Sequence, residues 1–168
     1  EIPVSKWDKK TINNSYETVI ATSAAIFRKS ALADINYYDL NWNWYTEDLE
    51  LCMRLIHKGY NTINMPELIA YHKSSLVNRN FNTMTQNSIE GMIMIYYKFF
   101  NFHIATKMYL QLLLLAISNS IYTRDIKYIK YSIISFVKLK RVLENRKLLD
   151  KSLLKKIKLP LGQIFSRL

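Results

Sequence analysis

The spacing of apolar residues divides the chain into a mixed N-terminal region and a long helical region. Residues 18–27, TVIATSAAIF, are apolar and β-branched at the start, which predicts a buried strand. Residues 28–33 predict a short helix or turn. Residues 34–45 are rich in aromatic and Asn side chains without a clean period, which predicts a loop with exposed function.

A helix is predicted to begin at Thr46, because Thr is favoured at N-caps and the acidic residues after it favour the positive end of the helix dipole. Gly59 is well placed to end this helix. Two short strands follow at residues 60–65 and 68–71, around Pro66. The helix presents a predicted buried stripe of Leu49, Cys52, Met53 and Ile56. This order of elements predicts an α/β or α+β fold.

Beyond residue 83 the pattern is helical, with almost no helix-breaking residue before Pro160. The longest apolar run, residues 108–117, is interrupted by Gln111 and is shorter than the roughly 20 residues that a bilayer crossing needs. Basic amphipathic helices are therefore predicted in place of a membrane span. Their predicted apolar face consists of Ile126, Ile129, Ile133, Val137 and Leu143.

The net charge of +11 is unevenly divided along the chain. Residues 1–82 carry 9 Lys and Arg against 9 Asp and Glu, whereas residues 83–168 carry 15 against 4. This division is typical of a catalytic or binding module joined to a segment that meets an anionic partner. Apolar stripes beside Lys and Arg favour a membrane surface over nucleic acid, for which no motif is present. Packing of the stripes against other helices is the alternative.

Composition narrows the class of protein further. Hydrophobic residues make up 49% and charged residues 22% of the chain, a globular balance that argues against disorder. The single cysteine, Cys52, excludes an internal disulfide and a cysteine-based zinc cage, and it suits a reducing compartment. No secretory signal pattern opens the sequence. We therefore expect a cytoplasmic protein, peripheral at the inner face of a membrane.

The segment at residues 46–60, TEDLELCMRLIHKGY, holds the residues that point to chemistry. On local grounds alone, an acidic pair at a helix start is more often a capping device than a catalyst. His72, after an apolar run, is likewise more often structural than a metal ligand. Aromatic side chains that could stack on a sugar ring, or form a buried cluster, precede the acidic pair: Trp42, Trp44 and Tyr45.

Together these motifs resemble the second half of glycosyltransferase family 2, with rhamnosyltransferase-like features. Members show a small-residue strand with an Arg-containing turn, an aromatic-Asp loop, an acidic pair opening a helix, and then a Pro and a strand-ending His. The corresponding residues here are 21–28, Tyr38-Asp39, 46–60, Pro66 and His72. The resemblance covers about residues 19–100. It implies a GT-A-like fold, with the acceptor-side part of a catalytic domain at residues 1–100 and a basic helical tail at residues 101–168.

The resemblance also implies roles for individual residues. Asp48 matches the general base that takes the proton of the acceptor hydroxyl, and Glu47 is expected to bind the acceptor or to act as an electrostatic partner. Arg54 is expected mainly to orient the acidic loop through an ion pair, and it completes the predicted substrate-binding set of Trp42, Trp44 and Tyr45. His72 matches a histidine that, in part of the family, helps to hold Mg²⁺ or Mn²⁺ against the nucleotide diphosphate.

The implied function is inverting transfer of a sugar from a nucleotide-diphosphate sugar to a hydroxyl of a cell-surface glycan or lipid-linked saccharide. The family's other metal ligands form an Asp-x-Asp motif in its N-terminal half, and this sequence contains no Asp-x-Asp. The chain alone is therefore expected to be an incomplete enzyme. Two alternatives stay open: a non-catalytic basic helical protein that binds membrane or nucleic acid, and an inactive transferase fragment.

Overall fold

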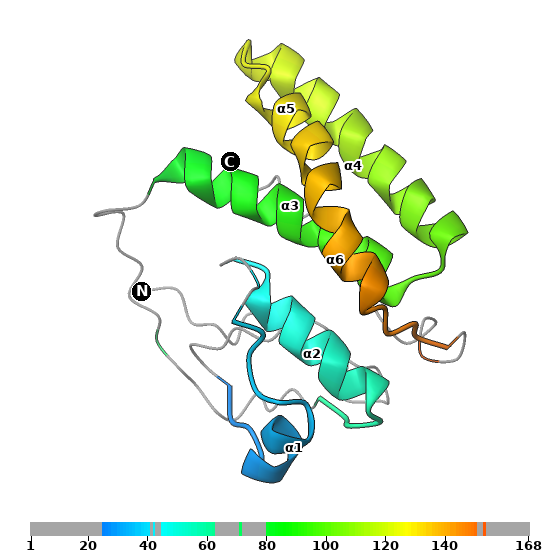
Figure 1. The fold of residues 1–168 in the computed structure, drawn as a ribbon. Helices are drawn as coiled ribbons and strands as arrows, with labels where there is room; N and C mark the ends of the chain where they lie inside the picture. The colour runs from blue at the N-terminus through cyan, green and yellow to red at the C-terminus, as the bar shows by residue number, and fades with distance from the viewer. Residues whose placement is uncertain are drawn as a thin grey trace, which may run out of the picture.

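The computed structural model describes residues 25–40, 42, 45–62, 71, 80–150 and 153. In Figure 1, α3 runs through the middle of the molecule, α2 lies on one side of it, and α4 runs antiparallel to α5 and α6 on the other. The elements in chain order are α1 (Lys29–Asp34), α2 (Glu47–His57), α3 (Phe81–Phe99), α4 (Phe102–Thr123), α5 (Lys127–Ile134), the 3-10 helix η3 (Ser135–Lys138) and α6 (Leu139–Glu144).

The predicted α/β, GT-A-like fold class is wrong for this part of the chain. Its described elements are helices, and no strand is present among the described residues. A β-pattern becomes a strand only where it pairs with a neighbour, and residues 25–27, the described end of the first predicted strand, lie in no ladder. Most of the two strands predicted at residues 60–71 lies outside the described residues.

The predicted helix at Thr46 is confirmed as α2. Thr46 is its N-cap residue, although the Thr46 hydroxyl makes no capping hydrogen bond. Gly59 ends the helix with a φ of +89°, a left-handed conformation that glycine adopts at little cost. The Gly59 and Tyr60 amides donate to the carbonyls of Ile56 and Leu55, which is the Schellman pattern. Both ends of α2 were predicted from residues next to them, Thr46 and Gly59, and the structure confirms both ends.

Helix α3 forms the centre of the core. It begins at Asn80, whose side chain accepts hydrogen bonds from the amides of Asn82 and Thr83. Every residue from Ile89 to Phe99 is buried, so this stretch is covered on all sides. The other helices pack around it, and its aromatic and sulfur-containing side chains join α2, α4, α5 and α6 into one apolar cluster. A smaller cluster attaches α1 to α2.

Helices α4 and α5 form an antiparallel pair joined at Arg124, which has a left-handed φ of 55°. Helix α4 is 22 residues long and contains an 18-residue window with a mean hydropathy of 1.3, and it is the one described helix that meets the length and composition of a membrane span. Helical structure extends beyond both ends of the apolar run at residues 108–117, so α4 is longer than that run suggested. Its buried side is composed of Ala105, Met108, Tyr109, Leu112, Ala116 and Ser120.

The segment after α6 returns to the C-terminal end of α3. Arg146 donates hydrogen bonds to the carbonyls of Tyr97 and Phe100, at 2.9 and 2.6 Å. The amides of Lys147 and Leu149 donate to the carbonyls of Lys98 and Phe99, each at 2.9 Å. The last carbonyls of a helix have no partner within that helix. Residues 146–149 therefore provide a cap for α3 from a distant part of the sequence.

Candidate functional site

The acidic pair Glu47 and Asp48 occupies the first turn of α2, and both residues are half-buried. Tyr45, two residues before Glu47, is 43% exposed and has a φ of +83°. Such a φ is uncommon for a bulky residue, and strained backbone gathers at functional sites. The pair is therefore held at the start of a helix, behind a sharp turn with an exposed aromatic side chain.

The pKa of Glu47 is raised above its ordinary value of 4.5. Burial is the largest cause, the nearby Asp48 carboxylate adds to it, and backbone N–H groups at the helix start act in the opposite direction. One Glu47 oxygen, Oε2, is buried without a hydrogen-bond partner in the described structure. Burial also raises the pKa of the Cys52 thiol to about 12, and Asp48 contributes to that shift. The first turn of α2 is therefore a partly desolvated, negatively charged site.

We expect Glu47→Gln to raise the melting temperature, and to raise it more at pH 7 than at pH 4. A carboxyl with a raised folded-state pKa stabilises the fold when protonated, and this contribution is lost as the pH rises through that pKa. Gln cannot ionise, so the variant avoids that loss. Thermal melts of both proteins at the two pH values test this. A constant difference between them would show that Glu47 is not desolvated in the folded protein.

A contact between α2 and α3 fixes the position of the acidic pair. Trp42 Nε1 donates to Thr46 Oγ1 at 2.9 Å, and both residues are buried. Gly91 of α3 lies directly against the Thr46 side chain. A Cβ added at Gly91 would overlap Thr46 Oγ1 and would lie 2.8 and 2.9 Å from its Cβ and Cγ2. The absence of a side chain at Gly91 thus lets α3 touch the N-cap of the helix that carries Glu47 and Asp48.

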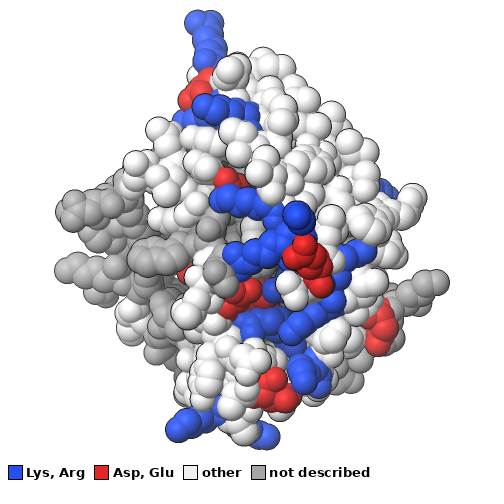
Figure 2. Space-filling view, in the orientation of Figure 1, with Lys and Arg blue, Asp and Glu red and all other residues white. Residues whose placement is uncertain are grey.

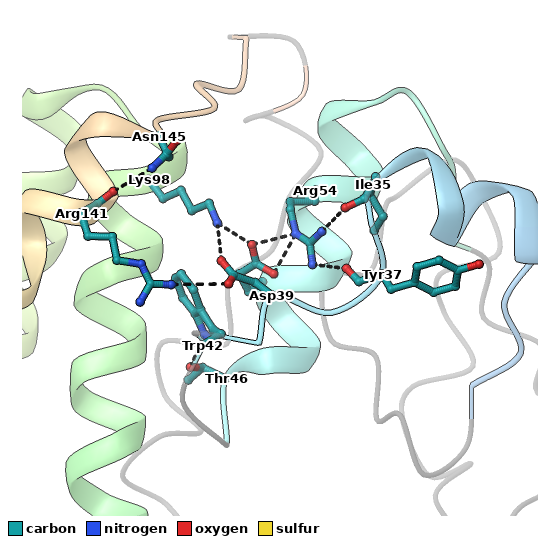
Figure 3. A network of polar contacts seen from close by, with 10 residues as sticks. Ile35, Tyr37, Asp39, Trp42, Thr46, Arg54, Lys98, Arg141 and Asn145 are labelled. Carbon is teal, nitrogen blue, oxygen red and sulfur yellow. Dashed lines mark hydrogen bonds and ion pairs between the residues drawn. The ribbon is translucent and has the colours of Figure 1, made fainter.

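One turn further along α2, Glu50 is at the centre of a buried ionic network. Figure 3 labels its two basic partners, Arg54 and Lys98. Its carboxylate lies 2.8 Å from Arg54 Nε and 2.6 Å from Lys98 Nζ of α3. Arg54 also donates to the carbonyls of Ile35 and Tyr37, which lie in the turn after α1. A buried carboxylate is stabilised only by such partners. The network therefore holds α2, α3 and the turn after α1 in one arrangement.

The network continues to the surface through Asp39. Asp39 lies 3.8 Å from Lys98 Nζ and 3.5 Å from Arg141 of α6. A pocket of about 170 Å³ opens at this point, with Trp42, Val142 and Asn145 among its walls. Lys98 Nζ also lies 4.8 Å from the centroid of the Trp42 ring, a cation–π distance. The aromatic-Asp loop is thus tied to the basic C-terminal region.

The structure places the predicted substrate-binding residues in different environments. Trp42 is buried, with its ring beside Lys98 and its N–H bonded to Thr46, as in the alternative of a buried aromatic cluster. Tyr45 is exposed. The guanidinium of Arg54 is used by Glu50 and two carbonyls, as expected for a residue that orients the loop. Trp44 and His72 lie outside the described residues, so their roles stay predictions.

The metal site also stays a prediction. Among the residues that the structure describes, no group of three or more His, Cys, Asp or Glu side chains lies close enough together to hold an ion. Glu47 and Asp48 are adjacent carboxylates of a kind that Mg²⁺ and Mn²⁺ accept. They are too few for a complete site, so any further ligands must come from elsewhere.

Sequence reasoning did not find three residues that position the site. Lys98 stands in no recognisable motif, yet it contacts Glu50 across 48 positions. Gly91 carried a recognisable signal, since an isolated glycine inside a helical pattern often marks a close approach. The sequence predicts for Glu50 only a favourable interaction with the helix dipole, as one of the acidic residues after Thr46. Its burial among two cations could not be inferred from spacing along one helix.

Comparison with known proteins identifies the chain more closely. It has no significant match among curated proteins or among solved structures. A family model described as Glycosyl transferase family group 2 matches residues 10–137, which is more than half of the chain. The match includes the acidic pair, the ionic network around Glu50 and helices α3 to α5. The chain therefore belongs to glycosyl transferase family group 2.

Proposed function

We propose that this chain belongs to an inverting glycosyltransferase in which Asp48 is the general base. The observation that carries the proposal is the half-buried acidic pair at the start of α2, in a chain whose family transfers sugars. The donor is a nucleotide-diphosphate sugar, and the acceptor is a hydroxyl of a cell-surface glycan or a lipid-linked saccharide. Hexosyl transfer of the rhamnosyltransferase type is the subtype that the sequence favours.

The chemistry explains the need for a carboxylate. A sugar hydroxyl is a weak nucleophile until a base accepts its proton while the bond to the anomeric carbon forms. The helix start that carries Asp48 is partly desolvated, and this burial raises the pKa of the neighbouring Glu47. Asp48 accepts the proton in this proposal. Glu47, which retains a buried oxygen without a partner, accepts a hydrogen bond from the acceptor sugar.

In the intact enzyme, we expect Asp48→Asn to preserve donor binding and to reduce turnover by on the order of 10² or more, because the amide cannot accept the proton. Donor binding by calorimetry and transfer by product formation measure the two effects separately. Asp34→Asn is a matched control, since Asp34 is a half-exposed carboxylate at the end of α1. Near-normal turnover of a folded Asp48→Asn protein would remove this mechanism. Turnover that is absent from the unaltered enzyme as well would support the inactive-fragment alternative.

We also propose that a divalent cation, Mg²⁺ or Mn²⁺, assists the reaction by neutralising the diphosphate that leaves. His72 is the ligand that the sequence motif favours for it. Because the described residues supply no complete ligand group, no step of the mechanism above depends on the ion.

Finally, we propose that the chain attaches to an anionic membrane surface at the cytoplasmic face, with no nucleic-acid partner. The basic half of the sequence supports attachment, since Lys and Arg near an anionic leaflet contribute about 1 kcal/mol each. The burial pattern supports it as well. Of the predicted apolar face, Ile126, Ile133, Val137 and Leu143 are exposed, so internal packing does not use them.

A further inference from the structure

Helices α4 and α5 expose large apolar side chains on the sides that do not face the core. The apolar surface meant here is defined by six residues, each more than half exposed: Leu110, Leu114, Ile121 and Tyr122 of α4, Ile126 at the start of α5, and Ile133 of α5. Single exposed apolar residues are common, but a contiguous group marks an interaction site. Figure 2 shows the region over α4 as almost free of charged side chains.

Helical geometry explains why these residues share the outer side. Leu110, Leu114 and Ile121 follow one another at spacings of four and seven, which places them on one stripe of α4. The residues that contact α3 and α5 lie on the opposite stripe and include Ala105, Leu112 and Ala116. Tyr122 and Ile126 lie on either side of the turn at Arg124, four positions apart in the chain. The apolar surface thus includes residues of α4, of the connection and of α5.

The charges around this surface favour an anionic partner. Between residues 102 and 144 the chain carries seven Lys and Arg against two acidic residues, Asp125 and Glu144. Lys107, Arg124 and Lys130 are exposed on the same two helices. Binding to a protein of ordinary surface composition would not require this excess of basic over acidic residues. Apolar side chains flanked by Lys and Arg are the combination that membrane interfaces select.

We propose that this apolar surface enters an anionic lipid leaflet with α4 and α5 lying parallel to the membrane plane. The inference rests on the membrane attachment proposed above and adds the surface and its orientation. In this proposal α4 lies at the membrane interface and does not span the bilayer, although it is long enough to cross one. Tyr122 and Arg124, at the connection between the helices, suit the headgroup region.

The packing of α4 explains why a parallel orientation is favoured. Ala105 and Ala116 are completely buried against neighbouring protein, so lipid cannot surround α4 without separating it from α3 and α5. If α4 crossed with α5 still attached, Lys127 and Lys130 would be carried into the hydrocarbon, where charged side chains are costly. In the parallel orientation the apolar side chains enter the leaflet and the lysines stay at the headgroups.

The test uses an environment-sensitive fluorophore on single introduced cysteines. Cys52 can be retained, because it is completely buried and the pKa of its thiol is about 12, which makes it unreactive with maleimides at neutral pH. The probe is placed at Leu114→Cys. Leu40→Cys is the matched control, since Leu40 is a 96% exposed leucine outside the apolar surface. Vesicles of phosphatidylcholine alone are compared with vesicles of equal parts phosphatidylcholine and phosphatidylglycerol, at low and high salt.

We expect the fluorescence at residue 114 to shift to the blue on the anionic vesicles, to shift less in high salt, and not to change at residue 40. Leu114→Asp combined with Ile121→Asp should reduce co-sedimentation with these vesicles by on the order of tenfold. Leu40→Asp should leave co-sedimentation unchanged. All of these side chains are exposed, so melting curves of the variants should match the unaltered protein.

The experiment tests membrane attachment and the assigned apolar surface separately. If the chain sediments but the probe at residue 114 does not shift, the attachment stands and the assigned surface is wrong. If the chain does not sediment, or sediments equally with neutral vesicles, both the membrane attachment and the assigned surface are wrong. The proposed sugar transfer is tested independently, because it can be measured with a soluble acceptor. Probes at His103→Cys and Ile121→Cys report the orientation. A reductant that cannot cross the membrane should quench both, and protection of one of them would show a span.

Discussion

Replacing Glu50 with Gln should lower the free energy of unfolding by about 3–5 kcal/mol, because it leaves two buried cations without their shared carboxylate. Glu50 is 1% exposed and lies within 3 Å of both Arg54 and Lys98. Gln has nearly the same volume, so the loss reflects charge rather than a cavity. Urea denaturation of the two proteins measures the difference.

An exposed ion pair between the ends of α1 and α2 provides the control for this measurement. Lys58 lies 3.5 Å from Asp34, and both side chains are almost half exposed. Asp34→Asn should cost less than about 1 kcal/mol, the usual range for solvated pairs. Adding Lys98→Met to Glu50→Gln should recover part of the stability, because it removes one of the unpaired cations. Equal costs for Glu50→Gln and Asp34→Asn would show that the network does not stabilise the fold.

Replacing Gly91 with Ala should destabilise the fold by about 3 kcal/mol, the upper end of the range for overpacked sites, and should also reduce turnover. The added Cβ would overlap the Thr46 side chain, so α3 must move away from the N-cap of α2. That movement displaces Glu47 and Asp48. Thermal melts and a transfer assay measure the two effects.

A second substitution separates overlap with Thr46 from the general effect of a larger residue at position 91. Thr46→Gly removes the side chain that the new methyl group would meet, and glycine is tolerated at N-caps. We therefore expect Gly91→Ala with Thr46→Gly to melt at a higher temperature than the sum of the single effects predicts. Strict additivity would mean that the two residues do not touch in the folded protein.

The helices were predictable where their signals are local. The start of α2 at Thr46, its end at Gly59, the short helix or turn after Arg28 and the helical region beyond residue 83 all follow from neighbouring residues. The ionic network was not predictable in the same way. Glu50 and Lys98 are 48 positions apart, and no spacing rule within one helix brings them together. Only the packing of α2 on α3 does so.

The predicted apolar face of α5 is not the side that packs internally, which excludes the packing alternative for its exposed residues. The buried residues are Tyr128 and Ser132 of α5 and Ser135 at the start of η3, while Ile126 and Ile133 are exposed. The two serines donate to the carbonyls of Tyr128 and Tyr131, four positions earlier in each case. A serine satisfied within its own helix is small and needs no other partner, so it can pack closely against a neighbour. A hydrophobicity pattern counts such a serine as polar and therefore predicts that its position is exposed to solvent.

The cap that residues 146–149 place on α3 sets an order for folding. Arg146 follows Tyr97 by 49 positions, so α3 emerges from the ribosome long before its C-terminal carbonyls can be paired. Closing contacts over such a distance is slow compared with forming a helix or a helical hairpin. We therefore expect the α4–α5 hairpin to form first and α3 to be completed last. A chain halted before Arg146 would leave four carbonyls at residues 97–100 without their native partners, and such a product would be a natural target for proteolysis.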